Sequence, residues 1–265
     1  MFKQRLVTSL VLVPLVLLGI FFANPYVLTA VFSLVLLLAG WEWAPLIPIK
    51  SPIKKTIFLL ALIAAAAASF YVVDFWLASL LLVWLLLLIA VVLYPKSQAI
   101  WGYSAVVCAL AFVLLPLLPA LFLSIYRDHG GPGMLVYLLF LVWAADVGGY
   151  VAGKLWGRNK LIPRVSPGKT LEGTLGGVFL AFGIATLAYF IFKPSMALMW
   201  FLLALCTISI SILGDLFISM LKRRSQVKDT GSILPGHGGI LDRFDSLIAA
   251  MPLFYMGLHF VGSVS

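Results

Sequence analysis

The sequence predicts an all-α, polytopic transmembrane helical bundle with about nine spans and a cytoplasmic N-terminus. Of its 265 residues, 63% are hydrophobic and only 10% are charged. Too few polar side chains would remain to cover the surface of a soluble domain of this length. The apolar residues also fall into runs of about 20 residues, the length of a helix that crosses ~30 Å of hydrocarbon.

Polar or helix-breaking residues divide the apolar sequence into nine runs, and each run is expected to form one span. Lys3 and Arg5 precede the first run, but no small-residue cleavage pattern follows it. A retained first helix is therefore favoured over a signal peptide. The predicted spans are 6–23, 26–47, 56–73, 75–93, 100–123, 133–153, 171–192, 197–220 and 240–261.

The basic residues predict the orientation of these spans. With the N-terminus inside, every lysine and arginine except Arg127 and Lys193 falls in a cytoplasmic segment, as the positive-inside rule requires. The net charge of +9 is not concentrated in a soluble domain. It therefore indicates anionic lipid as a neighbour and argues against a nucleic-acid partner. We expect a multi-pass protein of the inner (cytoplasmic) membrane whose polar site faces the cytosol, and the sequence leaves a homodimer open.

Two regions of the chain differ in polarity. Residues 1–132 consist of short spans with minimal loops and are expected to form an N-terminal transmembrane scaffold. Residues 133–265 are expected to form the catalytic transmembrane region, with long polar cytoplasmic loops at 154–170 and 222–239. Neither loop can lie in lipid unless protein covers it. The loops have no counterpart in the first half, which counts against the inverted repeats of many secondary transporters.

Three acids interrupt predicted spans at similar depth. Glu42, Asp146 and Asp215 each lie about two turns before a cytoplasmic lysine, roughly 10–12 Å below the boundary. A carboxylate inside a span costs about 2.5–3.5 kcal/mol, so each needs a partner or a function. Ser219 and Lys222 follow Asp215 on the same helix face. The acids predict a recessed polar cavity open to the cytosol, in which the role of Glu42 stays open.

The last span begins with two further acids. Asp242 and Asp245 are three residues apart, so on a helix they point the same way and repel unless a cation lies between them. Mg²⁺ takes oxygen ligands and typically binds through one or two carboxylates plus a substrate phosphate. Arg243 faces elsewhere, where it can meet phosphate. Together with the glycine-rich bend before it and Lys228-Asp229 further upstream, this pair predicts a metal-bound phosphate substrate.

The segment 166–173 precedes the seventh span and can bind an anion. Free N–H groups at a helix start, with Lys169, Ser166 and Thr170, suit a phosphate. An ordinary helix cap with Glu172 near the helix dipole is the alternative. Pro163 stands where a P-loop requires glycine, so a P-loop is excluded.

The segment from Ser219 to Asp245 resembles the C-terminal signature of the phosphatidate cytidylyltransferase (CDP-diacylglycerol synthase) family. The resemblance implies the reaction of CTP with phosphatidate to give CDP-diacylglycerol and pyrophosphate, with Mg²⁺ as cofactor and the lipid bilayer as surroundings. It is specific over about residues 143–246. The matching residues are Ser219, Lys222-Arg223, Lys228-Asp229, Gly231, Pro235, His237-Gly238-Gly239, Asp242-Arg243 and Asp245.

Residue chemistry and this resemblance together assign the site. We expect Asp215, Asp242 and Asp245 to hold the metal ion, with Asp146 as a further ligand, and Lys222 and Arg243 to act with them in catalysis. Two other functions stay open, a CTP-dependent polyprenol or lipid kinase and a transporter of an anionic solute. The expected substrate-binding residues are Ser166, Lys169, Thr170, Arg223, Lys228, Asp229, His237, Gly238 and Gly239.

Overall fold

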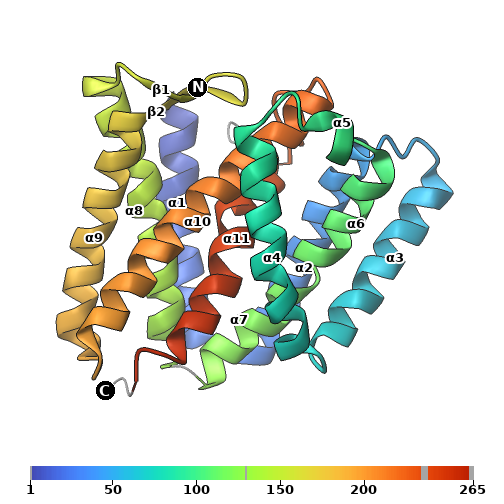
Figure 1. Cartoon of the computed structure of the whole chain (residues 1–265). Helices are drawn as coiled ribbons and strands as arrows, with labels where there is room; N and C mark the ends of the chain where they lie inside the picture. The colour runs from blue at the N-terminus through green and yellow to red at the C-terminus, as the bar shows by residue number, and fades with distance from the viewer. Residues whose placement is uncertain (1, 129, 234–237, 263–265) are drawn as a thin grey trace.

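The computed structural model describes residues 2–128, 130–233 and 238–262. Long helices that run between two ends of the molecule make up most of it, which confirms the predicted helical membrane-protein class (Figure 1). The helices are α1 (Phe2–Phe22), α2 (Pro25–Trp43), the short 3₁₀ turn η1 (Ala44–Leu46), α3 (Pro52–Ser69), α4 (Val73–Val92), α5 (Gln98–Trp101), α6 (Ser104–Leu114), α7 (Leu117–Asp128), α8 (Pro132–Trp156), α9 (Leu171–Phe192), α10 (Ala197–Arg224) and α11 (Leu241–Leu258).

These helices follow the predicted spans in order, with α5, α6 and α7 together in place of the fifth. Among the described residues, seven helical segments are long and apolar enough to cross a membrane. Helix α1 contributes only the shorter apolar stretch Val11–Phe22. The charged residues of helix α11 are Asp242, Arg243 and Asp245, all near its start. The count of nine spans and the cytoplasmic N-terminus therefore stay predictions.

The fifth predicted span is broken in the structure. Helix α6 ends at Leu114 and α7 begins at Leu117, so this predicted span consists of two helices, although the stretch Ser104–Arg127 as a whole is long and apolar enough to cross a membrane. Pro116 lies at the break, and proline interrupts helices because it lacks an N–H and its ring clashes with the preceding turn. The Pro116 carbonyl accepts a hydrogen bond from Ser69 Oγ of α3 at 2.9 Å. Helix α3 thus provides a hydrogen-bond donor for a backbone carbonyl at the break.

The polar segment before α9 contains the two strands found in the described part of the chain. Strand β1 (Lys160–Ile162) pairs antiparallel with β2 (Ser166–Thr170), with Lys160 opposite Thr170 and Ile162 opposite Ser166. The all-α prediction misses this hairpin. Because α9 begins only at Leu171, Ser166 lies in a strand and not at a helix start. Helix α9 thus begins where the seventh span was predicted to begin, and Ser166 and Lys169 precede it in β2.

Close backbone contacts join the C-terminal helices in two pairs. A Cβ added to Gly148 of α8 would lie 2.7 Å from the Gly176 carbonyl oxygen of α9. A Cβ added to Gly214 of α10 would lie 2.5 Å from the Asp245 carbonyl oxygen of α11. Small residues allow membrane helices to approach this closely. The second contact brings Asp215, the neighbour of Gly214, beside Asp245.

Helix α2 connects the first half of the chain to this region. The Trp43 indole N–H donates to the Val107 carbonyl of α6 at 3.0 Å, and the Trp43 ring lies 6.2 Å from the Phe217 ring of α10. Trp43 is fully buried. Its packing fixes the end of α2, and therefore Glu42, against the segment that leads into α11.

Candidate active site

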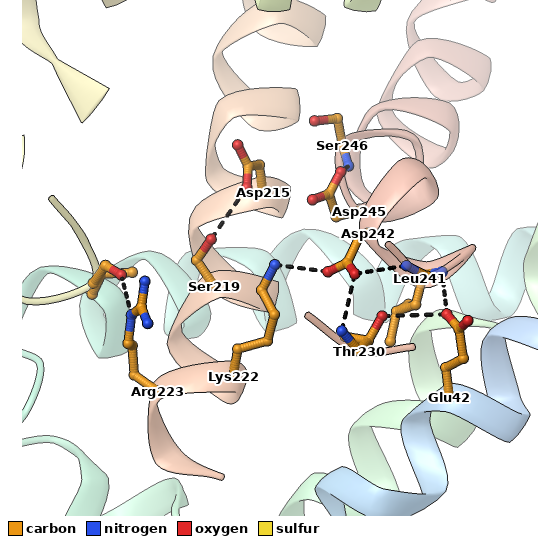
Figure 2. Close-up of polar contacts among 12 residues, drawn as sticks. Glu42, Asp215, Ser219, Lys222, Arg223, Thr230, Leu241, Asp242, Asp245 and Ser246 are labelled. Carbon is orange, nitrogen blue, oxygen red and sulfur yellow. Dashed lines mark hydrogen bonds and ion pairs between the residues drawn. The ribbon is translucent and has the colours of Figure 1, made fainter. Parts of the chain in front are cut away.

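The predicted site residues gather where β2, the C-terminal turns of α10 and the start of α11 meet. This end of the molecule also holds the β1–β2 hairpin (Figure 1). Figure 2 shows the side chains of α10 and α11 facing one another, with Glu42 of α2 below the start of α11. The structure thus places these polar side chains at one end of an apolar bundle.

Asp215 lies on α10 between a cation and a hydroxyl. Lys169 Nζ of β2 lies 2.5 Å from Asp215 Oδ2, and both side chains are about one-quarter exposed. Ser219 Oγ donates to Asp215 Oδ1 at 3.2 Å, as the spacing of four residues predicts. The pair with Lys169 joins the hairpin to α10, two segments that are far apart in sequence.

Asp245 is buried in α11 and lies within reach of two other acids. Its Oδ1 accepts a hydrogen bond from the Ser246 N–H at 2.7 Å. The negative charges of Asp215 and Asp146 both act on this carboxylate. Asp146 of α8 also interacts electrostatically with Arg243. Helices α8, α10 and α11 thus contribute one acid each to what we call the acidic centre, formed by Asp146, Asp215 and Asp245.

Asp242 has separate partners from Asp245. Lys222 Nζ of α10 lies 2.7 Å from Asp242 Oδ1. Asp242 Oδ2 accepts hydrogen bonds from the Thr230 N–H at 2.9 Å and the Gly239 N–H at 3.0 Å. Figure 2 shows these contacts converging on the Asp242 carboxylate. Both of its oxygens are therefore engaged in ordering the segment before α11.

Two glycines allow the backbone of the segment before α11 to lie close to the carboxylates of Asp242 and Glu42. Gly238 has φ +81°, a conformation that residues with a Cβ rarely adopt, and an added Cβ would lie 3.1 Å from Asp242 Oδ2. A Cβ on Gly239 would collide with the side chains of Glu42 and Thr230. The two predicted binding glycines therefore shape the backbone around two carboxylates.

The basic triplet that ends α10 makes three different contacts. Lys222 pairs with Asp242, as described. Arg223 Nε donates to the Val165 carbonyl in the hairpin at 3.1 Å. Arg224, which the sequence analysis left unassigned, donates to the Gly102 carbonyl at 2.6 Å and the Leu46 carbonyl at 2.7 Å. The triplet thus anchors the end of α10 to the acid of α11, the hairpin and the first half of the chain.

The start of α9 has the capping contacts of an ordinary helix. Thr170, a predicted substrate-binding residue, is buried, and its Oγ1 accepts a hydrogen bond from the Gly173 N–H at 3.1 Å. The Glu172 carboxylate accepts from the backbone N–H groups of Arg158 and Asn159, both at 3.1 Å. The capping alternative is therefore present in the structure, while Lys169 points instead to Asp215.

The remaining predicted residues lie around this centre. Lys228, Asp229, Arg223 and Arg243 are exposed. Asp229 lies near Gly238, since a Cβ on that glycine would be 3.6 Å from Asp229 Oδ1. His237 lies outside the described residues. Glu42 and Thr230 have site contacts that the sequence analysis did not assign, and only the burial of an acid inside a predicted span signalled Glu42.

Comparisons with known proteins place this chain in a family. The sequence profile of the Cytidylyltransferase family matches residues 3–261. The chain is 35% identical to the Phosphatidate cytidylyltransferase of Haemophilus influenzae, over 98% of this chain and 100% of that protein. It is 37% identical to the protein of the same name from Pseudomonas aeruginosa, over 96% of each chain, and 44% identical to that of Bacillus subtilis, over 48% of each. The chain therefore belongs to the cytidylyltransferase family and is a membrane-embedded nucleotidyltransferase.

Proposed function

We propose that this enzyme transfers the cytidylyl group of CTP to phosphatidate, giving CDP-diacylglycerol and pyrophosphate, at the inner face of the cytoplasmic membrane. The names of relatives that match nearly the whole chain support this substrate pair. The observation that carries the proposal is the acidic centre, bordered by Lys169 and Lys222, at one end of an apolar bundle. A site in this place can take a nucleotide from the cytosol while the acyl chains of the lipid stay in the bilayer.

The proposed reaction needs cations more than it needs a base. An ionised phosphate oxygen of phosphatidate attacks the α-phosphorus of CTP. The bond from that phosphorus to the oxygen bridging to the β-phosphate breaks, and pyrophosphate leaves with the bonding electrons. Because the nucleophile is already ionised, no side chain has to remove a proton. The barrier comes from bringing anions together and from charge on the leaving group, which fixed positive groups stabilise.

Asp215 and Asp245 are the carboxylates that would hold Mg²⁺, with Asp146 beside them. Asp245 is buried, and the like charges of the other two acids act on it, so a cation would relieve their repulsion. In the part of the chain that the structure describes, no three His, Cys, Asp or Glu side chains lie close enough together to form a metal site by themselves. Magnesium typically binds through one or two carboxylates plus substrate phosphate, so the donor set fits. Bound there, the ion would neutralise charge on the nucleotide phosphates.

Asp242 receives a different role from the one its spacing suggested. Both of its oxygens are engaged by Lys222 and by two backbone N–H groups. We assign it to positioning: it holds the Lys222 ammonium at the edge of the acidic centre. Its place among the metal ligands stays a prediction from sequence.

The cations around the acidic centre are proposed to bind phosphates of the two substrates. Lys169 is held by Asp215 in the structure and would turn to phosphate when a metal ion takes its place on that carboxylate. Residues of the flanking segments would complete the substrate contacts. The proposed phosphate-binding cations are Lys169, Lys222, Arg223, Lys228 and Arg243, and the other proposed substrate-binding residues are Ser166, Thr170, Asp229, His237, Gly238 and Gly239.

Two labels on CTP test this function. Purified protein in lipid nanodiscs containing phosphatidate is given CTP labelled at either the α- or the γ-phosphate. We expect the α-label in a lipid product and the γ-label in released pyrophosphate. Transfer of the γ-label to a lipid would contradict the proposal and indicate a kinase. Uptake of an anionic solute into vesicles without any lipid product would indicate a transporter.

A further inference from the structure

Glu42 is a buried acid of the first half of the chain that contacts the segment leading into α11. It is 3% exposed. Its Oε2 accepts a hydrogen bond from the Leu241 N–H at 2.8 Å and another from Thr230 Oγ1 at 3.2 Å. Both donors are more than 180 positions away in sequence. An acid of the predicted scaffold therefore reaches into the predicted catalytic region.

The backbone of that segment closes over the Glu42 carboxylate. A Cβ on either Gly231 or Gly239 would collide with the Glu42 carboxylate oxygens. Its second oxygen, Oε1, is buried and has no hydrogen-bond partner among the described residues. A buried carboxylate is costly unless its contacts compensate. The fit of two glycines around it indicates a specific contact and not a solvated acid.

Glu42 also caps the start of α11, whose own N-cap residue provides no capping side chain. The N-cap residue of α11, Ile240, has no side chain that can accept a hydrogen bond from the first turn. Leu241 is the first residue of that helix, and its N–H is one of the groups that a helix start leaves without a partner. A carboxylate at a helix N-terminus also interacts favourably with the helix dipole. Glu42 thus fixes where and in which direction α11 begins.

A chain of contacts carries this position into the acidic centre. Thr230 donates through its hydroxyl to Glu42 and through its N–H to Asp242. Asp242 in turn holds Lys222. Three residues further along the same helix lies Asp245. The start of α11 therefore sets the positions of a proposed phosphate-binding cation and a proposed metal ligand together.

We propose that Glu42 is a positioning residue for cytidylyl transfer, acting through Thr230 and the start of α11. The inference rests on the function proposed above. It makes the first half of the chain part of the active site and gives a role to Glu42, which the sequence analysis placed at the predicted cavity without assigning its function.

Substitutions that keep or remove the acceptor oxygen test this role. Glu42→Gln keeps an oxygen for Leu241 and Thr230, and we expect its kcat to stay within about threefold of wild type. Glu42→Ala removes the oxygen, and we expect kcat to fall by roughly tenfold or more while the KM for CTP changes much less. An equal loss in both variants would overturn the proposal, because it would indicate a role for the charge itself in metal binding or proton transfer.

Ser69→Ala is the matched control in the first half of the chain. Ser69 is also buried, and its Oγ donates to the Ala66 carbonyl at 2.7 Å and to the Pro116 carbonyl at 2.9 Å. Its loss should lower stability and leave kcat unchanged. If Glu42→Ala behaves like Ser69→Ala, with lower stability and an unchanged kcat, Glu42 is structural only and the proposal is wrong.

Thr230 provides a second route that does not depend on folding of the Glu42→Ala variant. Thr230→Ser keeps the hydroxyl and should keep kcat, whereas Thr230→Val should lower it. An unchanged kcat in Thr230→Val would contradict the relay.

Hydrogen exchange separates this inference from the proposed function. In substrate-free protein, the Leu241 amide should exchange faster in Glu42→Ala than in wild type and remain protected in Glu42→Gln. If wild type made no CDP-diacylglycerol but this exchange pattern held, the proposed function would fail while the contact of Glu42 with α11 stood. If wild type were active and Leu241 exchanged equally in all three proteins, the positioning role would fail alone.

Discussion

Asp242→Asn perturbs the contacts that order the start of α11. The Asp242 and Lys222 side chains are 6% and 13% exposed, and their charged atoms lie 2.7 Å apart. The other oxygen of Asp242 accepts hydrogen bonds from the N–H groups of Thr230 and Gly239. Asparagine has one acceptor oxygen, so it can serve either the lysine or the two N–H groups. One set of contacts must be lost.

The expected loss of stability follows from these contacts. A hydrogen bond to a charged group contributes about 1.5–3 kcal/mol, and removing one partner of a buried ion pair costs about 3–5 kcal/mol. Because Lys222 keeps some contact with solvent and asparagine keeps part of the bonding, we expect the free energy of unfolding to fall by about 2–3 kcal/mol. Nearly all turnover should disappear as well, since the Lys222 ammonium is no longer held beside the acidic centre.

Denaturant unfolding in detergent and cytidylyl transfer from labelled CTP measure the two effects. Glu172→Gln is a matched control, because this carboxylate also accepts two backbone N–H groups but lies outside the acidic centre. It should retain activity. Lys222→Met should reproduce the loss of turnover, and the double variant should be little worse than either single one. An Asp242→Asn protein with wild-type stability and rate would refute the reasoning.

Three further predictions follow from the site and the topology. Lys169→Ala should lower turnover or CTP binding by more than about tenfold, and unchanged kinetics in this variant would indicate that Lys169 has only a structural role. Thr170→Ala, which removes the cap of α9, should instead lower the free energy of unfolding by about 1 kcal/mol. Chelation should abolish turnover and Mg²⁺ should restore it, with Asp245→Asn inactive under both conditions; full turnover in metal-free buffer would contradict the metal assignment. A cysteine at position 160, in a chain without native cysteines, should react with an impermeant thiol reagent only from the cytoplasmic side, and labelling from outside would contradict the nine-span topology.

Much of the site could be predicted from spacing along single helices. The contact of Ser219 with Asp215 is a neighbour relation on one helix face, which a sequence displays directly. The position of Lys222 on the same face as Asp215 and Ser219 followed from the same spacing, whereas its contact with Asp242 of α11 did not. The helices themselves were predictable because apolar runs of this length have few other structures open to them in a membrane.

Contacts between distant segments could not be predicted in the same way. The hydrogen bond from the Leu241 N–H to Glu42 joins residues 199 positions apart in the sequence, and no local pattern predicts it. Arg224 had the same appearance as its two basic neighbours, yet it binds backbone carbonyls of the first half of the chain. The hairpin was missed because β1 and β2 are too short to show a clear alternation of polar and apolar residues.

The contact of Gly214 with the Asp245 carbonyl means that main chain, and not side-chain rotamers, sets the distance between the two proposed ligand-bearing segments. At this point the helices cannot come closer, because the next atom in that direction is a carbonyl oxygen. Magnesium binds oxygen at about 2.0–2.1 Å and calcium at about 2.3–2.6 Å. Backbone contact therefore sets the shortest separation of the two helices but does not stop them from moving apart for a larger ion, so a preference for Mg²⁺ over Ca²⁺ would have to come from the placement of the carboxylate side chains.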